Sequence, residues 1–175
     1  MRIAVLLLLA ATPALAQSAL KKHDTNAPID IDAARIEVAD KAGLSTWTGD
    51  VRVKQGDLNL DANQVKLHYH RKGDTPVIER LDAVGAVHLT SPTERATGDY
   101  GIYDVERRLV TMTGNVVLNQ NQSVLRGSRL VIDLDSGRST LDGNRSGPAT
   151  PGLPGTATDG ARVTGHFVVP EKRAQ

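Results

Sequence analysis

Two histidines, His68 and His70, come closest to a metal-binding pair in this sequence. Residues two apart on a β-strand share one face, so the two imidazoles could coordinate one ion together. Val65, Leu67 and Tyr69 take the alternate positions, however, which indicates that the histidines lie on a solvated outer face. We therefore expect no metal site.

Two carboxylate pairs, Asp30 with Asp32 and Asp133 with Asp135, have a spacing that could serve acid–base chemistry. Each pair alternates with an apolar residue next to a predicted turn, which is typical of the exposed face of a strand. The sequence contains no cysteine and no Gly-x-Ser-x-Gly, His-Glu-x-x-His or phosphate-binding glycine motif. We therefore predict neither an enzyme nor a cofactor.

Glycines at regular spacing mark a repeat along the chain. Residues 48–53, 84–89 and 113–118 share one frame, in which Gly is followed by a small or polar residue, Val, any residue and an apolar residue. Spacings of 36, 29 and 29 residues separate Gly49, Gly85, Gly114 and Gly143. A recurring period in this range is typical of stacked supersecondary units.

A second small residue follows the first three glycines by thirteen positions, at Ala62, Gly98 and Gly127. The longer spacing comes from a seven-residue insertion near residues 71–75, whose glycine and neighbouring proline favour a longer turn. Partial copies of the unit at residues 31–36 and 141–144 flank the full units. We expect these half-units to form the edges of the domain.

Within each unit the apolar residues alternate with polar ones, as Val51 and Val53 alternate with Arg52 and Lys54. Alternation over four to six residues is the pattern of a half-buried strand, and no segment after residue 20 shows a helical period. Aromatic residues make up only 3% of the chain, so the core must be aliphatic. The sequence predicts an all-β domain of antiparallel strands.

The N-terminus has the features of a secretory signal. A short apolar run follows Arg2 and ends in Ala14-Leu15-Ala16, so residues 1–16 are expected to be removed by cleavage between Ala16 and Gln17. Residues 17–144 form the expected β domain. Residues 145–175 are rich in Pro and Gly and are expected to form a flexible tail, with room for one short strand within 161–169.

The formal net charge is +1, and charges of both signs are scattered without a basic block, so nucleic acid is not expected as a partner. A stack of amphipathic strands has to cover its aliphatic face. Its two layers can close as a packed sandwich or splay into an apolar trough that suits acyl chains. Both arrangements use the same inward residues, which are the candidates for lipid binding: Ile31, Val51, Val53, Leu58, Leu60, Val65, Leu67, Val87, Leu89, Ile102, Met112, Val116, Leu118, Leu130 and Ile132.

The order of these motifs resembles the LptA/OstA-like family. The resemblance covers roughly residues 24–143 and rests on segments 28–33, 49–56, 60–65, 96–104 and 109–116 in that order. It implies a twisted open β-jelly roll of two antiparallel sheets, here built from strand repeats of 29 residues. The expected signal peptide favours the LptA type over the membrane-anchored LptC, and the short chain argues against LptD with its large barrel.

The resemblance also implies a function. Members of this family are periplasmic and carry lipopolysaccharide from the inner to the outer membrane, with the acyl chains of lipid A between the two sheets. The implied partners are lipopolysaccharide itself, the LptC-like OstA domain at the inner membrane and the LptD-like OstA domain at the outer membrane. A head-to-tail homo-oligomer is a further implied assembly.

Two other functions stay open from the sequence. The chain could be a structural adaptor that joins envelope proteins by edge-strand pairing without carrying lipid. It could also be an exported enzyme with His68 and His70 in a metal site. Basic residues near strand ends are candidates for contact with lipid phosphates, although solubility explains them equally well: Arg35, Lys54, Arg126 and Arg129.

Overall fold

The computed structural model describes residues 23–120, 122–143 and 163–166, and most of these lie in β-strands. One 3₁₀ helix, η2 (Asp40–Ala42), precedes β3. Within the described part of the chain, no helix is long and apolar enough to cross a membrane. The strands are β1 (Ile29–Asp32), β2 (Arg35–Ala39), β3 (Leu44–Gln55), β4 (Leu58–Lys72), β5 (Thr75–Thr90), β6 (Glu94–Asp104), β7 (Leu109–Gln120), β8 (Ser123–Asp133), β9 (Arg138–Asp142) and β10 (Thr164–His166).

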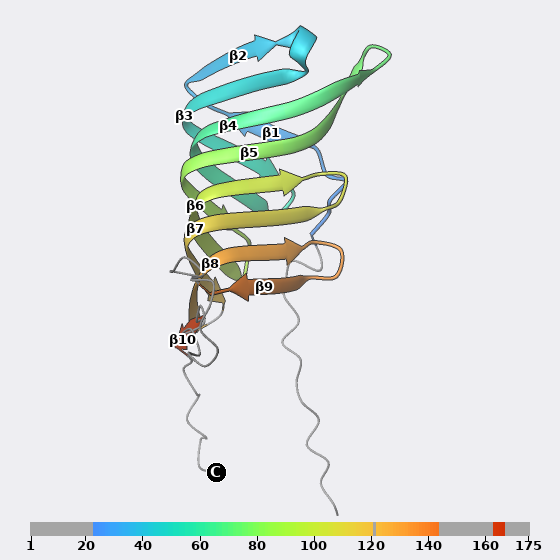
Figure 1. The fold of residues 1–175 in the computed structure, drawn as a ribbon. Coiled ribbons are helices and arrows are strands. Elements are labelled where there is room, and N and C mark those ends of the chain that lie inside the picture. The colour runs from blue at the N-terminus through green and yellow to red at the C-terminus, as the bar shows by residue number, and fades with distance from the viewer. Residues whose placement is uncertain (1–22, 121, 144–162, 167–175) are drawn as a thin grey trace, which may run out of the picture.

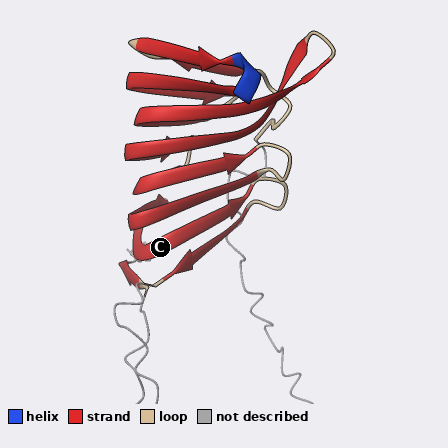
Figure 2. Ribbon diagram, turned by 45° about the horizontal axis from the view of Figure 1, so that its top comes forward, coloured by secondary structure: helices blue, strands red, loops and turns tan. Residues whose placement is uncertain are grey.

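All ten strands belong to one antiparallel sheet that folds over into two layers (Figures 1 and 2). The long strands β3 to β8 pair in sequence order, and each bends in its middle so that its two halves lie in different layers. In the first layer β2 pairs with residues 44–48 of β3, whereas in the second layer β1 pairs with residues 52–55. The expected all-β jelly roll is confirmed, with both of its layers drawn from one continuous hydrogen-bonded sheet.

A row of β-bulges produces this bend. On β3, Gly49 and Asp50 are inserted opposite the single residue Asn63 of β4, and the register shifts there. Residues 85–86 of β5 and 114–115 of β7 repeat the arrangement. In each pair the glycine has φ between 78° and 85° and the next residue between 46° and 48°. Two successive residues at positive φ turn a strand sharply, and glycine adopts this conformation at the least cost. The glycine repeat therefore marks the bend line.

Strands β4, β6 and β8 cross the bend line in another way. On β4, Ala62 faces the interior before the bend and Val65 faces it afterwards, three positions along instead of two or four. On β8 the inward position moves in the same way from Gly127 to Leu130. Inward-facing residues of a strand are normally separated by an even number of positions. After this step of three, the inward positions beyond the bend line therefore change from even to odd numbers or from odd to even.

The insertion near residues 71–75 lengthens two strands instead of their turn. Strand β4 runs to Lys72 and β5 starts at Thr75, so the turn consists of Gly73 and Asp74 alone. Pro76 lies inside β5 opposite Arg71. The expectation of a longer turn is wrong, because the inserted residues continue the antiparallel ladder and form the projecting hairpin of Figure 1.

The half-units lie at the edges of the sheet, as the repeat predicts. Strands β1 and β2 both pair with β3 at one end, and β9 and β10 both pair with β8 at the other. Strand β10 falls within residues 161–169, where a final strand was expected. The predicted signal peptide with its Ala16/Gln17 junction lies outside the described residues, as does most of the predicted tail.

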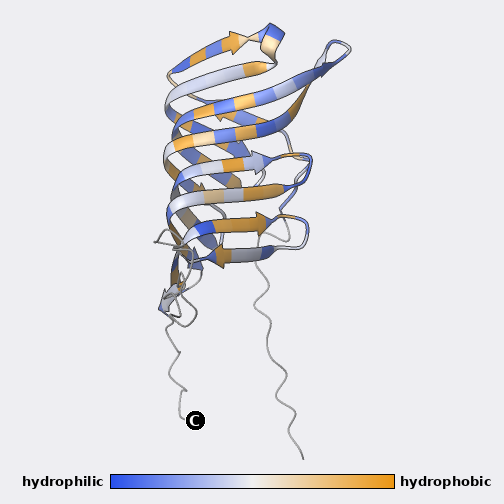
Figure 3. Ribbon diagram, in the orientation of Figure 1, coloured by the Kyte–Doolittle hydropathy of each residue, from blue (hydrophilic) through white to orange (hydrophobic). Residues whose placement is uncertain are grey.

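The core lies between the two layers and is almost entirely aliphatic. Hydrophobic and polar residues alternate along the strands (Figure 3), so that one face of each layer is apolar. Tyr103, which is 8% exposed, adds a ring to this core. The largest fully buried side chains are Leu81, Met112, Leu130, Ile132, Leu134, Val51, Val65, Val87 and Val116.

We expect Gly49→Ala to destabilise the protein by about 1–3 kcal/mol more than Gly73→Ala. Both glycines have positive φ, +85° and +64°, so backbone strain is common to the two variants. A Cβ at position 49 would lie 2.8 Å from the Cβ of Ala34, whereas nothing lies within 4 Å at position 73. Urea unfolding measures the difference, and equal losses would contradict a need for close approach at the bend line.

Candidate functional site

The inner faces of the two layers hold nearly all the residues that the sequence assigned to a groove. Cross-strand pairs such as Val53 with Leu60, and Leu60 with Leu89, place these side chains on one continuous face. Most are buried, while Ile31, Leu60 and Leu67 are partly buried against the same core. Lipid contact by these residues stays a prediction. The candidates found on the inner faces are Ile31, Val51, Val53, Leu58, Leu60, Val65, Leu67, Val87, Leu89, Met112, Val116, Leu118, Leu130 and Ile132.

Ile102 is the exception, because its side chain is 42% exposed on the outer face of β6. The alternation of apolar and polar residues had placed it among the inward candidates. At the bend line the inward position moves from Gly98 to Gly101, so that Tyr103 lies in the core and Ile102 points outward with Tyr100. The assignment of Ile102 to the groove is therefore wrong.

Seven further buried hydrophobic residues of the interior are missing from the candidates that the sequence provided: Ala62, Leu81, Ala83, Ala96, Tyr103, Val110 and Leu134. For β6, the spacing of the repeat would have indicated which residues face inward. Leu130 and Ile132 follow Gly127 by three and five positions, and both are buried. The same offsets counted from Gly98 give Gly101 and Tyr103, so aligning the units would have found the correct inward residues.

The interior is filled by the side chains that meet from the two layers. A cavity of about 20 Å³ remains beside β1, which is the volume that a single water molecule needs. The middle of the interior is packed, because eighteen hydrophobic side chains there are at most 8% exposed, whereas ten others that pack against them are only partly buried. The cavity is lined by Ile29, Val53, Gln55, Leu58, Leu60, Leu81 and Tyr103.

One polar side chain, Gln55, lies in this apolar lining and is 4% exposed. Its Nε2 donates to the carbonyl oxygens of Thr25 and Ala27, both at 3.0 Å. Its Oε1 accepts a hydrogen bond from the hydroxyl of Tyr103 at 2.9 Å and lies 3.3 Å from Nε2 of His23. The amide thus connects β3 in one layer, β6 in the other layer and the segment before β1.

Burial raises the pKa of the Tyr103 hydroxyl above its ordinary value. The hydroxyl therefore keeps its proton at neutral pH and acts as the donor to Gln55. Near it, at the end of the first layer, Arg108 forms an ion pair with Asp135 at 2.8 Å. This hydrogen bond to Asp135 raises the pKa of the Arg108 guanidinium.

The histidine pair lies on the outer face of β4, and each imidazole has its own carboxylate. His68 Nε2 lies 2.9 Å from Asp82, and His70 Nδ1 lies 2.8 Å from Glu79. Arg80 also reaches Asp82, at 2.8 Å. The described residues contain no cluster of three or more His, Cys, Asp or Glu side chains that could hold a metal ion.

The paired carboxylates have structural surroundings. Asp133 accepts hydrogen bonds from the backbone N–H groups of Ser136 and Asp135, at 2.9 and 3.0 Å. These bonds, that of Ser136 first, lower the pKa of the Asp133 carboxyl. Asp30 and Asp32 are exposed on β1. Neither pair points into the interior.

The basic candidates also lie outside the interior. All four side chains are exposed, and two of them pair with carboxylates on the surface: Arg35 with Glu37, and Arg129 with Asp142. The exposed pair at position 35 is a weak, screened interaction. The remaining two, Lys54 and Arg126, point outward from strands of the second layer. Contact with lipid phosphates stays a prediction for all four.

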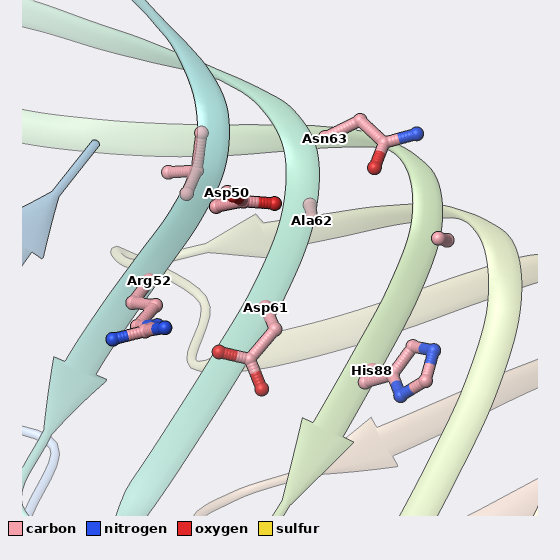
Figure 4. Close-up of a pocket in the computed structure, with 8 residues that line it drawn as sticks. Asp50, Arg52, Asp61, Ala62, Asn63 and His88 are labelled. Carbon is pink, nitrogen blue, oxygen red and sulfur yellow. The ribbon is translucent and has the colours of Figure 1, made fainter. Parts of the chain in front are cut away.

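A hollow of about 360 Å³ lies on the outer surface along the bend line (Figure 4). Arg52, Asp61 and His88 are successive cross-strand neighbours on β3, β4 and β5, and they stand side by side at this hollow. Their mixed charges and outward direction make it a polar surface depression. Val51, Ala62 and Ala86 also line it, but its charged side chains suit an acyl chain less well than the aliphatic inner face does.

The described residues thus form a two-layered sheet with an apolar interior and without a cluster that could hold a metal ion. The family model described as LptA/(LptD N-terminal domain) LPS transport protein matches residues 30–138, more than half of the chain. The chain belongs to this family. The resemblance seen in the sequence is thereby confirmed.

Individual relatives agree with this assignment. An uncharacterized protein of Rhizobium meliloti is 29% identical over 145 residues, covering 77% of this chain and 78% of that protein. The lipopolysaccharide export system protein LptH of Pseudomonas aeruginosa is 29% identical over 126 residues, covering 67% and 72%. The crystal structure of LptH, called an LptA-homologous periplasmic component of the lipopolysaccharide transport device, matches with a TM-score of 0.67. That match has 22% identity and covers 84% of this chain and 99% of LptH, which establishes a common fold.

Truncation of an inner-face residue of this LptA-family domain should cost far more stability than truncation of Ile102. We expect Leu130→Ala to lower the free energy of unfolding by about 2–5 kcal/mol, because Leu130 is 0% exposed. Ile102→Ala should change it by less than about 0.5 kcal/mol. Chemical denaturation measures both, and a large loss at Ile102 would contradict its outward placement.

Proposed function

We propose that this protein is a periplasmic component of a lipopolysaccharide bridge and carries the acyl chains of the lipid between its two layers. The observation that carries the proposal is the continuous aliphatic inner face, found in a chain that belongs to a family of LPS transport proteins. The inner faces run from β1 and β2 at one end to β9 at the other, so the lining extends along the whole stack of strands.

The chemistry of this lining suits acyl chains. Transfer of a methylene group from water to an apolar environment is favourable by about 0.8 kcal/mol, and an acyl chain has many such groups. The inner face offers aliphatic side chains such as Val53, Leu60 and Leu118, with few rings or charges. Because the interior is filled in the closed molecule, lipid entry requires the two layers to part on the side away from the bend line.

The apolar lining is uncovered at the N-terminal end. Ile36 and Val38 of β2 pair with Trp47 and Ser45, which lie on the inner side of β3, so all four share the inward face. Ile36 is nevertheless 47% and Val38 57% exposed, so within the described part of the chain the second layer leaves them largely uncovered. A partner domain that adds strands at this end would cover them and continue the lining.

These features support end-to-end assembly as part of the proposal. β2 is an edge strand, and its free backbone groups can pair with a strand of a second chain. The partners we propose are a second copy of this chain and the related domains of LptC-like and LptD-like proteins. Head-to-tail contacts of this kind extend into a bridge, because the two ends of the molecule differ. The export signal predicted at residues 1–16 supports a periplasmic location.

Photo-crosslinking in cells that make lipopolysaccharide tests the carrier function. A photoreactive residue at Leu60, Leu118 or Ile132 is expected to yield lipopolysaccharide adducts, because these side chains lie on the inner face. The same residue at Asn59 or Ile102 serves as the outward control and should yield none.

Adducts at no position, in an exported and folded protein, would reject lipid carriage. The structural adaptor that joins envelope proteins by edge pairing would then be the better account, because the packed interior is compatible with it. Adducts of equal yield at inward and outward positions would instead indicate binding to the surface.

A charge on the exposed apolar edge tests assembly. Ile36→Lys and Val38→Lys should reduce self-association in analytical ultracentrifugation, because lysine on an edge strand opposes pairing with another chain. Tyr100→Lys replaces an equally exposed apolar residue, 55% exposed, away from the edge and should leave self-association unchanged. Loss of assembly in all three variants would show that surface charge in general, and not this edge, controls it.

A further inference from the structure

We infer that Gln55, the hydroxyl of Tyr103 and the segment of residues 23–27 form a latch that holds the two layers together on their open side and controls lipid entry. The inference rests on the proposed function, since it concerns access to the same interior. Its parts come from three places in the chain: the end of β3, the end of β6 and the segment before β1.

The position of the latch suits this role. Gln55 is the last residue of β3, five positions beyond the bulge at Asp50, and Tyr103 lies near the end of β6, beyond the bend at Gly98. Each is therefore far from the bend line, where the two layers are joined by the backbone itself. The hydrogen bond between them, at 2.9 Å, joins the layers on a side where none of the described strands passes from one layer to the other.

The hydrogen bonds of the latch use the full capacity of the amide. A glutamine side chain has two N–H donors and an oxygen with two lone pairs. Both donors of Gln55 reach backbone carbonyls, of Thr25 and Ala27, and its oxygen meets Tyr103 and His23. A buried amide with every position satisfied favours one arrangement strongly, because parting the layers leaves polar groups to find new partners.

The small apolar cavity lies directly behind the latch. Gln55 and Tyr103 are themselves part of its lining, next to Ile29, Leu58 and Leu81. Separation of Gln55 from Tyr103 would therefore connect this cavity with the outside at the end of the stack where β1 and β2 lie. The aliphatic inner face, the small cavity and the latch therefore meet at one place. An entrance for an apolar ligand needs all three there.

Gln120, which occupies the position of Gln55 in another repeat unit, forms no such latch. The latch therefore occurs at the N-terminal end of the stack, where Gln55 lies. Six residues after the repeat glycine stand Gln55 in one unit and Gln120 in another. Gln120 donates to Glu94, which lies on the neighbouring strand of the same layer. Gln55 instead reaches across to Tyr103 of the other layer, so the same residue type closes the interior only where its partner stands opposite.

The test uses Tyr103→Phe, which keeps the ring and removes the hydroxyl, and Gln55→Met, which removes all the bonds of the amide. The matched control is Tyr69→Phe, which removes a tyrosine hydroxyl that donates to Asp40 at 3.0 Å within the first layer. Hydrogen exchange of amides in residues 51–55 and 100–104 reports opening without lipid. The rate of uptake of fluorescently labelled lipopolysaccharide by the same full-length proteins reports entry.

We expect Tyr103→Phe to raise both the exchange rates and the uptake rate roughly fivefold, the factor that loss of one hydrogen bond produces. Gln55→Met should raise them further, and Tyr69→Phe should behave as the wild type. Unchanged exchange in Tyr103→Phe and Gln55→Met would overturn the latch. Faster exchange with unchanged uptake would overturn its control of entry. If no protein, including the wild type, takes up lipid, the proposed function fails and control of lipid entry fails with it, whatever the exchange rates show.

Discussion

The bend line is the constraint on which the rest of this structure depends. A ten-stranded sheet with one apolar face has to cover that face, and this chain covers it with the other half of the same sheet. The fold requires that each long strand bends sharply where it crosses one common line across the sheet. In β3, β5 and β7, pairs of residues with positive φ at 49–50, 85–86 and 114–115 provide these turns. In β4, β6 and β8, which lie between them, the step between inward-facing positions is instead three residues at the bend. Without this row the two layers would not face each other.

From this row follow both the closed core and the asymmetry of the molecule. One long side is held by covalent backbone, because six strands pass through the bend. On the opposite side the described strands turn back within their own layers, and contacts such as the hydrogen bond from Tyr103 to Gln55 hold the layers together. A molecule built in this way has a preferred side for opening, and an apolar ligand that replaces the aliphatic packing would enter there. The filled interior and the proposed carriage of lipid are therefore compatible.

The two ends of the stack differ for a similar reason. At the N-terminal end, β2 extends the first layer beyond the cover of the second, so Ile36 and Val38 stay exposed on the inward face. At the C-terminal end, β9 and β10 pair with the two halves of β8. The N-terminal end is therefore the place where the proposed partner strand would pair, because it exposes both apolar lining and an edge strand.

The sequence by itself determined the strands, the repeat and most of the inward residues, because alternation and glycine spacing are local properties of the chain. Val51, Met112 and Leu130 could be assigned in this way, and so could the edge positions of the half-units. Ile102 could not be placed by alternation alone, since the inward-facing positions of β6 shift by one residue where the strand crosses the bend line. Only the tertiary structure decided that the layers are packed and that Gln55 meets Tyr103, forty-eight residues away. Those contacts depend on how two halves of a bent sheet are brought together, which no local pattern records.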